Sequence, residues 1–405
     1  MTQPAALLIR NVRPLAAEPV DLLVQQGRIA AIGTSLQASA DCAVEEGGGA
    51  ILLPGLVESH THLDKTLWGL DWYRNEVGSR LVDKIDNERS FRAGSKHDAG
   101  AQSLALARAF LANGTTRLRT HVDVDTQAGL RYVEGVIGTR AALRDVQQIQ
   151  VVAFPQSGLL KREGTAELLD RAMASGADVL GGLDPCAIDG DPVRSLDTLF
   201  AIAERYAAPL DIHLHEPGAM GAFSLELILD RTEAHGLQGK VAISHGFCLG
   251  DVSDAEREAL LARMAKLGVS LITSAPPSRT VPPLLACRRA GVTVAGGNDG
   301  IRDTWSPYGK PDMLDRAMFI GMRYNLRQDD EIAVALDCVT NSGARACGFA
   351  DYGLAIGDRA DLVLVDAQTV AQAVVSQPVR RLVVAGGRIV ARQGALLASA
   401  ASPQA

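Results

Sequence analysis

Between about residues 55 and 351, short apolar runs alternate with longer segments of helical periodicity. The runs are rich in Val, Ile and Leu, which is typical of parallel strands buried on both faces. We predict strands at 116–122, 148–154, 179–183, 210–214, 241–244, 270–273 and 292–296, with helices among them at 101–112, 165–174, 196–206 and 254–266. The apolar run 51–59 supplies one more strand. Eight β/α units predict a (β/α)8 TIM barrel, an α/β fold whose parallel strands need helical crossovers.

The two chain ends share a different pattern. Residues 21–33 and 381–390 each read as a strand, a turn containing glycine and a second strand, and 356–366 is a further turn leading into a buried strand. We therefore predict that both ends form one small β-sandwich. The expected domains are 1–54 plus 352–398 for the sandwich, 55–351 for the barrel and 399–405 as a tail.

Composition narrows the possible partners. The 405 residues are 47% hydrophobic and 21% charged, with a net charge of −7, so a well-buried enzyme is expected. An acidic chain offers no basic footprint for nucleic acid or for an anionic membrane, which leaves a small molecule as the expected partner. Six scattered cysteines without a C-x-x-C pair argue against a zinc ribbon or a disulfide framework. With no signal-type or spanning segment, we expect a soluble cytoplasmic protein, and a homo-oligomer is compatible with the sequence.

The candidate chemistry begins with His60 and His62 at the end of the run 51–59. Residues two apart on a strand project to the same side, so both imidazoles can grip one divalent cation. An isolated His-x-His is more often a satisfied polar pair. Here, however, six of the eight histidines fall at predicted strand ends, where a TIM barrel carries its chemistry.

We predict one metal site and a set of groups that act around it. His60, His62, His213 and Asp299 are the expected ligands of one divalent ion, zinc or iron, that activates water. Glu216 is expected to transfer protons, with Asp299 taking the water proton and His245 orienting the attacking group. Because Gln156, and no lysine, follows the strand 148–154, one metal is favoured over a lysine-bridged pair.

Other polar residues near the strand ends leave two interpretations open. His121 and Asp123 face the same side of their strand, and we favour support of the first histidines over direct ligation. Asp64 and Lys65 are either pocket groups or a loop ion pair. Asp184, followed by Pro185, is either a substrate contact or part of a turn, and a turn is favoured.

With these residues in view, the chain resembles the amidohydrolase superfamily, and within it the cytosine deaminase-like branch. The matching motifs lie at 53–65, 119–124, 152–158, 243–245 and 303–309. The resemblance implies one iron or zinc at His60, His62, His213 and Asp299, and proton transfer by Glu216. It also implies that Gln156 pairs with a ring amide and that Trp305 is an aromatic pocket residue.

Two departures bear on the substrate. Gly300 stands where cytosine deaminases carry a second aspartate, and His215 replaces an acidic residue. At both places the chain is more similar to N-isopropylammelide amidohydrolases, which release an alkylamine from a triazine. We expect the space at Gly300 to admit a substituted amine, and we count Lys65 and His215, with Gln156 and Trp305, as substrate-binding.

The sequence therefore predicts a metal-dependent deaminase or aminohydrolase that releases ammonia or an alkylamine from a pyrimidine- or triazine-like heterocycle, by attack of hydroxide on a C–N carbon. Two alternatives are kept. One is a ring-opening hydrolase of cyclic amides, like hydantoinases and dihydroorotases. The other is a barrel that serves as a non-catalytic scaffold.

Overall fold

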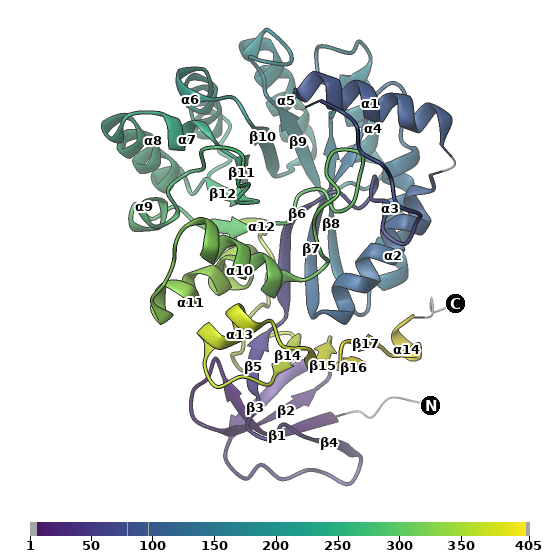
Figure 1. Ribbon diagram of the computed structural model, residues 1–405, viewed down its shortest axis with the longest axis vertical. Helices are drawn as coiled ribbons and strands as arrows, with labels where there is room; N and C mark the ends of the chain where they lie inside the picture. Colours follow the sequence, from purple (N-terminus) through teal and green to yellow (C-terminus); the bar gives the residue numbers. More distant parts are fainter. Residues whose placement is uncertain (1–5, 79, 96, 402–405) are drawn as a thin grey trace.

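The computed structural model describes residues 6–78, 80–95 and 97–401, and its central feature is a barrel of eight parallel strands (Figure 1). In chain order the strands are β6 (Leu56–Thr61), β7 (Thr115–Asp123), β8 (Gln148–Phe154), β9 (Val179–Leu183), β10 (Leu210–Leu214), β11 (Val241–His245), β12 (Ser270–Thr273) and β13 (Val294–Gly296). Each pairs with the next, and a bridge between Thr61 and Asp299 brings the last strand back to the first. The predicted TIM barrel is confirmed.

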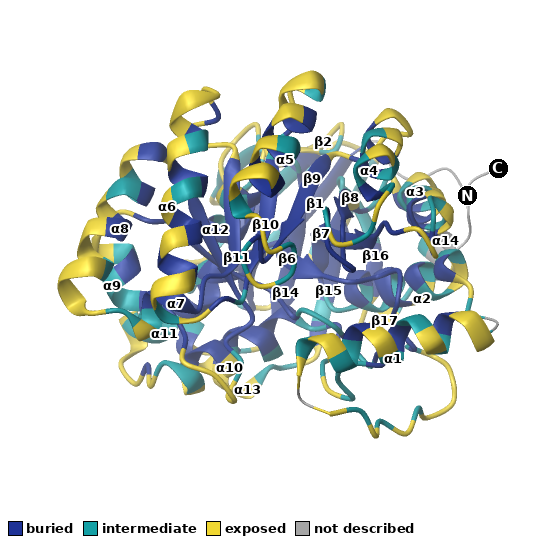
Figure 2. Ribbon diagram, turned by 90° about the horizontal axis from the view of Figure 1, so that it is seen from above, coloured by how far each residue is buried: buried dark blue, intermediate teal, exposed yellow. Residues whose placement is uncertain are grey.

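Helices surround the barrel, and many of them carry buried residues toward it and exposed residues on the outside (Figure 2). They are α1 (Leu81–Gly94), α2 (Ala99–Ala112), α3 (Arg131–Leu143), α4 (Thr165–Ala174), α5 (Pro192–Tyr206), α6 (Gly218–Ala234), α7 (Cys248–Asp251), α8 (Asp254–Leu267), α9 (Leu284–Arg289), α10 (Met313–Arg323), α11 (Asp329–Cys338) and α12 (Asn341–Cys347). Local sequence explains their ends. Asp191 caps α5 by accepting from Arg194 N, and Gly268 ends α8 in the left-handed region.

The two chain ends together form the predicted β-domain, drawn in purple and yellow at the bottom of Figure 1. Its strands are β1 (Ala6–Pro14), β2 (Val20–Gln25), β3 (Arg28–Gly33), β4 (Cys42–Glu46), β5 (Ile51–Pro54), β14 (Leu362–Val365), β15 (Arg380–Ala385), β16 (Arg388–Arg392) and β17 (Ala395–Leu396), with α13 (Val370–Ser376) and α14 (Ala398–Ala401). The first half of β1 pairs with β2 and β4, whereas Arg13 and Pro14 pair with β5. Leu7 and Ile9 share one core with Leu52 and Leu364, so residues from both ends are buried together.

The run 51–59 is not one strand, as predicted, but two strands in different sheets. Gly55 separates β5 from β6, and its N–H donates to Asp361 O over 2.7 Å. A Cβ on Gly55 would lie 2.2 Å from the Thr116 hydroxyl oxygen, so only glycine lets the chain pass from the end domain into the barrel here. We keep 1–54 plus 352–398 and 55–351 as proposed domain boundaries. Of the predicted tail 399–405, residues 402–405 lie outside the described residues.

Helix α1 was not anticipated, because its sequence has no clear apolar stripe. It follows β6 and buries two charged residues, Glu88 and Arg92, with Ile85. Ionic contacts replace the hydrophobic periodicity by which a surface helix is normally found. In the described part of the chain, no helix is both long and apolar enough to cross a membrane.

Gly297 follows β13 and lies against His60 of β6, where the barrel closes. A Cβ there would lie 2.5 Å from His60 Cβ and 2.7 Å from both His60 N and O. We expect Gly297→Ala to lower the free energy of unfolding by about 1–3 kcal/mol, because close-packed backbone must shift. Thermal unfolding measures this. Gly321→Ala is the matched control, since Gly321 lies in α10 and its added Cβ meets nothing within 4 Å. Equal loss of stability in both variants would contradict the prediction.

Candidate active site

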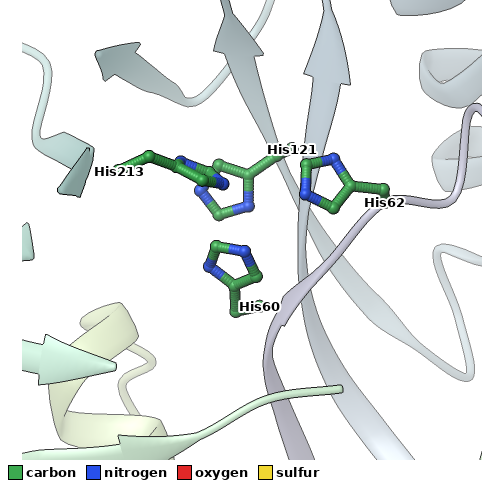
Figure 3. Close-up of side chains that lie close together, drawn as sticks. All are labelled: His60, His62, His121 and His213. Carbon is green, nitrogen blue, oxygen red and sulfur yellow. The ribbon is translucent and has the colours of Figure 1, made fainter. Parts of the chain in front are cut away.

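Four histidines from three strands point toward one another (Figure 3). His60 and His62 come from the end of β6, His121 from β7 and His213 from β10. One ring nitrogen of each lies within 4.8 Å of the corresponding nitrogens of the others. The rings of His60 and His213 have centroids 4.6 Å apart, and those of His60 and His121 are 4.2 Å apart. The structure thus brings the three predicted histidine ligands together and places His121 directly beside them.

Asp299 and His245 lie next to this cluster. The Oδ1 atom of Asp299 is 3.7 Å from His60 Nε2 and 3.4 Å from His62 Nε2, while its Oδ2 is 4.0 Å from His245 Nε2. The Asp299 backbone N–H donates to His60 O over 2.8 Å, which fixes the carboxylate at the seam between β13 and β6. Asp299 is 39% exposed, so it is the one member of this group that opens toward solvent.

The cluster has the properties of a metal site. Within the described residues, His60 Nε2, His62 Nδ1 and both ring nitrogens of His213 are buried and have no hydrogen-bond partner. An unpartnered buried nitrogen is costly unless something binds it. Burial, together with Lys65 near His62 and with the other histidines near His213, holds the pKa of both rings well below their usual range. The rings are therefore neutral, as metal ligands must be, and neutral imidazoles with one carboxylate suit zinc or iron.

Three polar residues at strand ends have a strained backbone. Asp184, His245 and Asp299 all have positive φ values, of 33°, 72° and 65°. Side-chain-bearing residues rarely adopt this region, and such strain gathers at functional sites where the surroundings hold it. The prediction that Asp184 belongs to a turn after β9 is compatible with this conformation.

His215 and Glu216 follow the end of β10 and contact different groups. The ring of His215 lies beside the histidine cluster. It stacks on His245 with centroids 4.4 Å apart, and its Nδ1 lies 2.8 Å from Asp184 Oδ2. Although burial lowers the pKa of His215, Asp184 raises it by charge and hydrogen bonding, and the raising effects win. Asp184 is therefore the partner of His215 as well as a turn residue.

The carboxylate of Glu216 contacts the loop after β9 and helix α6. Its Oε1 accepts from the backbone N–H groups of Cys186 and Ala187, each over 2.8 Å, and its Oε2 accepts from the Ser224 hydroxyl over 2.5 Å. Burial raises the pKa of Glu216 despite these donors. A carboxyl group with a raised pKa can hold a proton nearer neutral pH.

The predicted substrate-binding residues also converge. Lys65 Nζ donates to Gln156 Oε1 over 2.6 Å and lies 4.9 Å from the centre of the Trp305 ring. The carboxamide oxygen of Gln156 thus accepts from Lys65, while its N–H groups can donate to a ligand. Trp305 is less purely apolar than expected, because its indole N–H donates to Glu88 Oε2 over 2.6 Å.

Helix α1 supplies residues that the sequence interpretation missed. Glu88 lies 3.7 Å from Lys65 Nζ and pairs with Arg92 over 2.7 Å, and Arg92 also pairs with Asp123. Asp64 Oδ2 accepts from the Asp123 backbone N–H over 2.8 Å. His62, Asp64 and Asp123 offer three further ligand atoms, but Lys65 and Arg92 already supply cations there. These are a buried ionic network rather than a loop ion pair.

The expected space at Gly300 is absent. A Cβ on Gly300 would lie 2.0 Å from Asp303 Oδ2, so the carboxylate of Asp303 fills the position that we expected to be open. Asp303 Oδ1 accepts from the N–H groups of Trp305 and Ser306, and burial raises its pKa to about 6. Gly300 is needed because the loop folds back toward Asp303. That the pocket admits a substituted leaving amine stays a prediction.

A match to a known family decides how this site is classified. The profile described as the amidohydrolase family matches residues 46–391. The chain belongs to the amidohydrolase family. The recognition from sequence motifs, and with it the prediction of a hydrolase acting on carbon–nitrogen bonds, is confirmed.

Individual relatives support the same branch. A crystal structure of N-isopropylammelide isopropylaminohydrolase from Burkholderia multivorans is 66% identical, with a TM-score of 0.95, and the match covers 97% of this chain and 100% of that one. The 5-methylcytosine deaminase of Klebsiella pneumoniae, liganded with 5-fluorocytosine, is 27% identical, with a TM-score of 0.85, over 95% of this chain and 97% of that one. N-isopropylammelide isopropyl amidohydrolase of Pseudomonas sp. (strain ADP) is 28% identical over 98% of this chain and its own full length.

Proposed function

We propose that this family member is a metal-dependent aminohydrolase that releases an alkylamine from a triazine of the N-isopropylammelide type. The observation that carries the reaction class is the buried group of imidazoles beside Asp299 at the carboxyl ends of the barrel strands. The choice of substrate is supported by the 66% identity to the Burkholderia multivorans enzyme across nearly the whole chain.

We assign the metal to His60, His62, His213 and Asp299, and we propose zinc or iron as the native ion. These residues would hold the ion, which would supply Lewis acidity toward a water molecule at neutral pH. His121 is the further imidazole within reach of the site. We propose that it supports the ligands, because its Nε2 lies 3.4 Å from the Asp211 carboxylate.

The protein's own groups then move protons and hold the substrate. Asp299 Oδ1 faces His60 and His62, while Oδ2 faces His245 at 4.0 Å, so this carboxylate can accept the proton of an attacking water. His245 is proposed to orient that water. Glu216 is proposed to carry the proton to the leaving amine, since burial raises its pKa.

Ring recognition is proposed for Gln156, Lys65, Trp305 and His215. Lys65 and the carboxamide of Gln156 lie side by side, and both carry N–H donors. Donors of this kind suit the carbonyl oxygens of an oxo-triazine, and the face of Trp305 suits a flat ring. His215 stacks on His245 and is partly exposed, which supports a role at the substrate side of the cluster.

Ring opening of a cyclic amide is the second candidate. The binuclear enzymes of that kind use a lysine after the strand that is β8 here. In this chain the Phe154 ring occupies the strand end and stacks on His213 with centroids 4.1 Å apart. This contact favours the single-metal aminohydrolase. The scaffold alternative is disfavoured because the ligand set and its neutral imidazoles are intact.

The proposal is tested by offering the zinc-loaded and iron-loaded protein N-isopropylammelide, cytosine and dihydroorotate in parallel. We expect isopropylamine release from the triazine at a higher kcat/KM than ammonia release from cytosine, and no ring opening of dihydroorotate. Turnover of dihydroorotate alone, or no turnover of any substrate by fully loaded protein, would overturn the proposal.

Gln156→Ala is expected to lower kcat/KM roughly tenfold or more, because loss of one buried hydrogen-bonding partner costs about 1–3 kcal/mol. Metal content should stay the same. The matched control is Gln147→Ala, since buried Gln147 donates to the backbone oxygens of Ala107 and Thr115 away from the site. That variant should lose stability but keep its kinetic constants. Unchanged kcat/KM in Gln156→Ala would exclude the proposed contact.

The setting of the reaction is also part of the proposal. We propose that the protein acts on a small molecule in the cytoplasm, where six free cysteines are compatible with a reducing compartment. Assembly into a homo-oligomer stays a prediction.

A further inference from the structure

Below the histidine cluster, a buried chain of polar groups runs from His60 toward the other end of the barrel. His60 Nδ1 lies 2.8 Å from Ser244 Oγ, and Ser244 Oγ donates to Asp211 Oδ1 over 2.6 Å. Asp211 Oδ2 accepts from Arg119 over 2.9 Å. Asp211 and Ser244 are both 0% exposed and Arg119 is 2% exposed, so water does not compete for these bonds.

The directions of these bonds determine where the His60 proton lies. The guanidinium of Arg119 favours the ionised form of Asp211, and a carboxylate only accepts hydrogen bonds. The single hydroxyl hydrogen of Ser244 is therefore used on Asp211, so Ser244 Oγ must accept from His60 Nδ1–H. Metal binding requires an imidazole with a free lone pair, and such a ring carries one proton, which here lies on Nδ1. His60 Nε2 consequently has a free lone pair, and it is the nitrogen that is buried, without a partner among the described residues and 3.7 Å from Asp299 Oδ1.

The strand register explains why these residues meet. Asp211 and His213 are two apart on β10 and face the same side, with Asp211 one layer deeper in the barrel. His213 pairs with Ser244 of β11, which places the hydroxyl between Asp211 and the neighbouring strand end. Arg119 in turn donates to Cys347 O and to Gln150 Oε1, each over 3.0 Å. These bonds fix the guanidinium that ends this row of hydrogen-bonded groups.

We infer that Asp211 and Ser244 are positioning residues that fix His60 in the tautomer whose Nε2 binds metal. The inference rests on the proposed function, in that it assigns a metal to this cluster. Outer partners of this kind hold ring orientation and basicity, and their loss typically costs 10–100-fold in metal affinity. Here a serine hydroxyl transmits the effect of the carboxylate to the ring.

The test measures Zn²⁺ affinity by competition with a chelator at one fixed pH. Ser244→Ala and Asp211→Asn should each raise the Kd for Zn²⁺ roughly 10–100-fold, while Ser244→Thr, which keeps the hydroxyl, should restore tight binding. Asp361→Asn is the matched control. Asp361 forms another buried aspartate–arginine pair, with Arg117 at 3.1 Å, and among the described residues it makes no hydrogen bond or ion pair with a histidine, so its loss should lower stability and leave the Kd unchanged.

A second readout does not depend on metal. In protein labelled with ¹⁵N-histidine and freed of zinc, the His60 resonances should report the Nδ1–H form in the wild type and a shift toward Nε2–H in Ser244→Ala. Unchanged Kd and unchanged tautomer in Ser244→Ala would overturn the inference, as would an equal rise of Kd in Asp361→Asn. Absence of Zn²⁺ binding by the wild type would instead refute the proposed function, and the tautomer measurement would still decide the role of Ser244.

Discussion

His213→Ala is expected to lose bound metal and activity together. The ring of His213 lies within 4.8 Å of the ligand nitrogens of His60 and His62, and neither of its nitrogens has another partner in the described chain. Loss of a ligand removes the Lewis acid, whose contribution is several kcal/mol, so kcat/KM should fall by about three orders of magnitude or more. Elemental analysis after loading with zinc or iron should find far less than one equivalent per chain.

The control for this variant is His235→Ala, because His235 is exposed at the end of α6 and outside the cluster. It should keep metal and turnover. Circular dichroism would confirm that both variants are folded. A His213→Ala protein that retains a full equivalent of metal at wild-type affinity would refute the ligand assignment. Two tightly bound equivalents in the wild type would refute the single-metal proposal.

Glu216→Gln is expected to keep its metal and lose turnover. Glutamine preserves the shape and the acceptor that meets the N–H groups of Cys186 and Ala187, but it cannot carry a proton. General acid–base catalysis contributes about 10²–10⁴-fold, and kcat should fall by an amount in that range with metal content near the wild-type value. Steady-state amine release, together with elemental analysis, measures both effects.

His215 and Asp184 provide the competing assignment for the same step. Asp184→Asn removes the carboxylate that lies 2.8 Å from His215 Nδ1 and should disturb substrate handling less than Glu216→Gln disturbs kcat. If Glu216→Gln retains wild-type kcat while Asp184→Asn loses it, His215 carries the proton and Glu216 only holds the loop that follows β9. If Glu216→Gln loses metal, Glu216 acts on the ligand set instead.

The local pattern of the sequence determined the barrel and the place of its chemistry. Strands such as 148–154, 179–183 and 210–214 coincide with β8, β9 and β10, because buried parallel strands are short apolar runs that need no long-range information to be found. Parallel strands joined by helices must align their carboxyl ends. The sequence alone therefore predicts that His60, His213 and Asp299 are neighbours.

Only the tertiary structure shows the features that depend on how separate strands, loops and helices pack against one another. Gly55 ends a strand inside an uninterrupted apolar run because the chain passes there from the sheet of the end domain into the barrel. Asp303 fills the position beside Gly300 because its loop turns back. Helix α1 is held by Glu88 and Arg92 rather than by an apolar stripe, so periodicity could not reveal it. Asp211 reads in sequence as one polar residue in a strand. Only the pairing of β10 with β11 shows that it lies beneath His60, since alternation gives the side of a strand and not the partner that a side chain meets there.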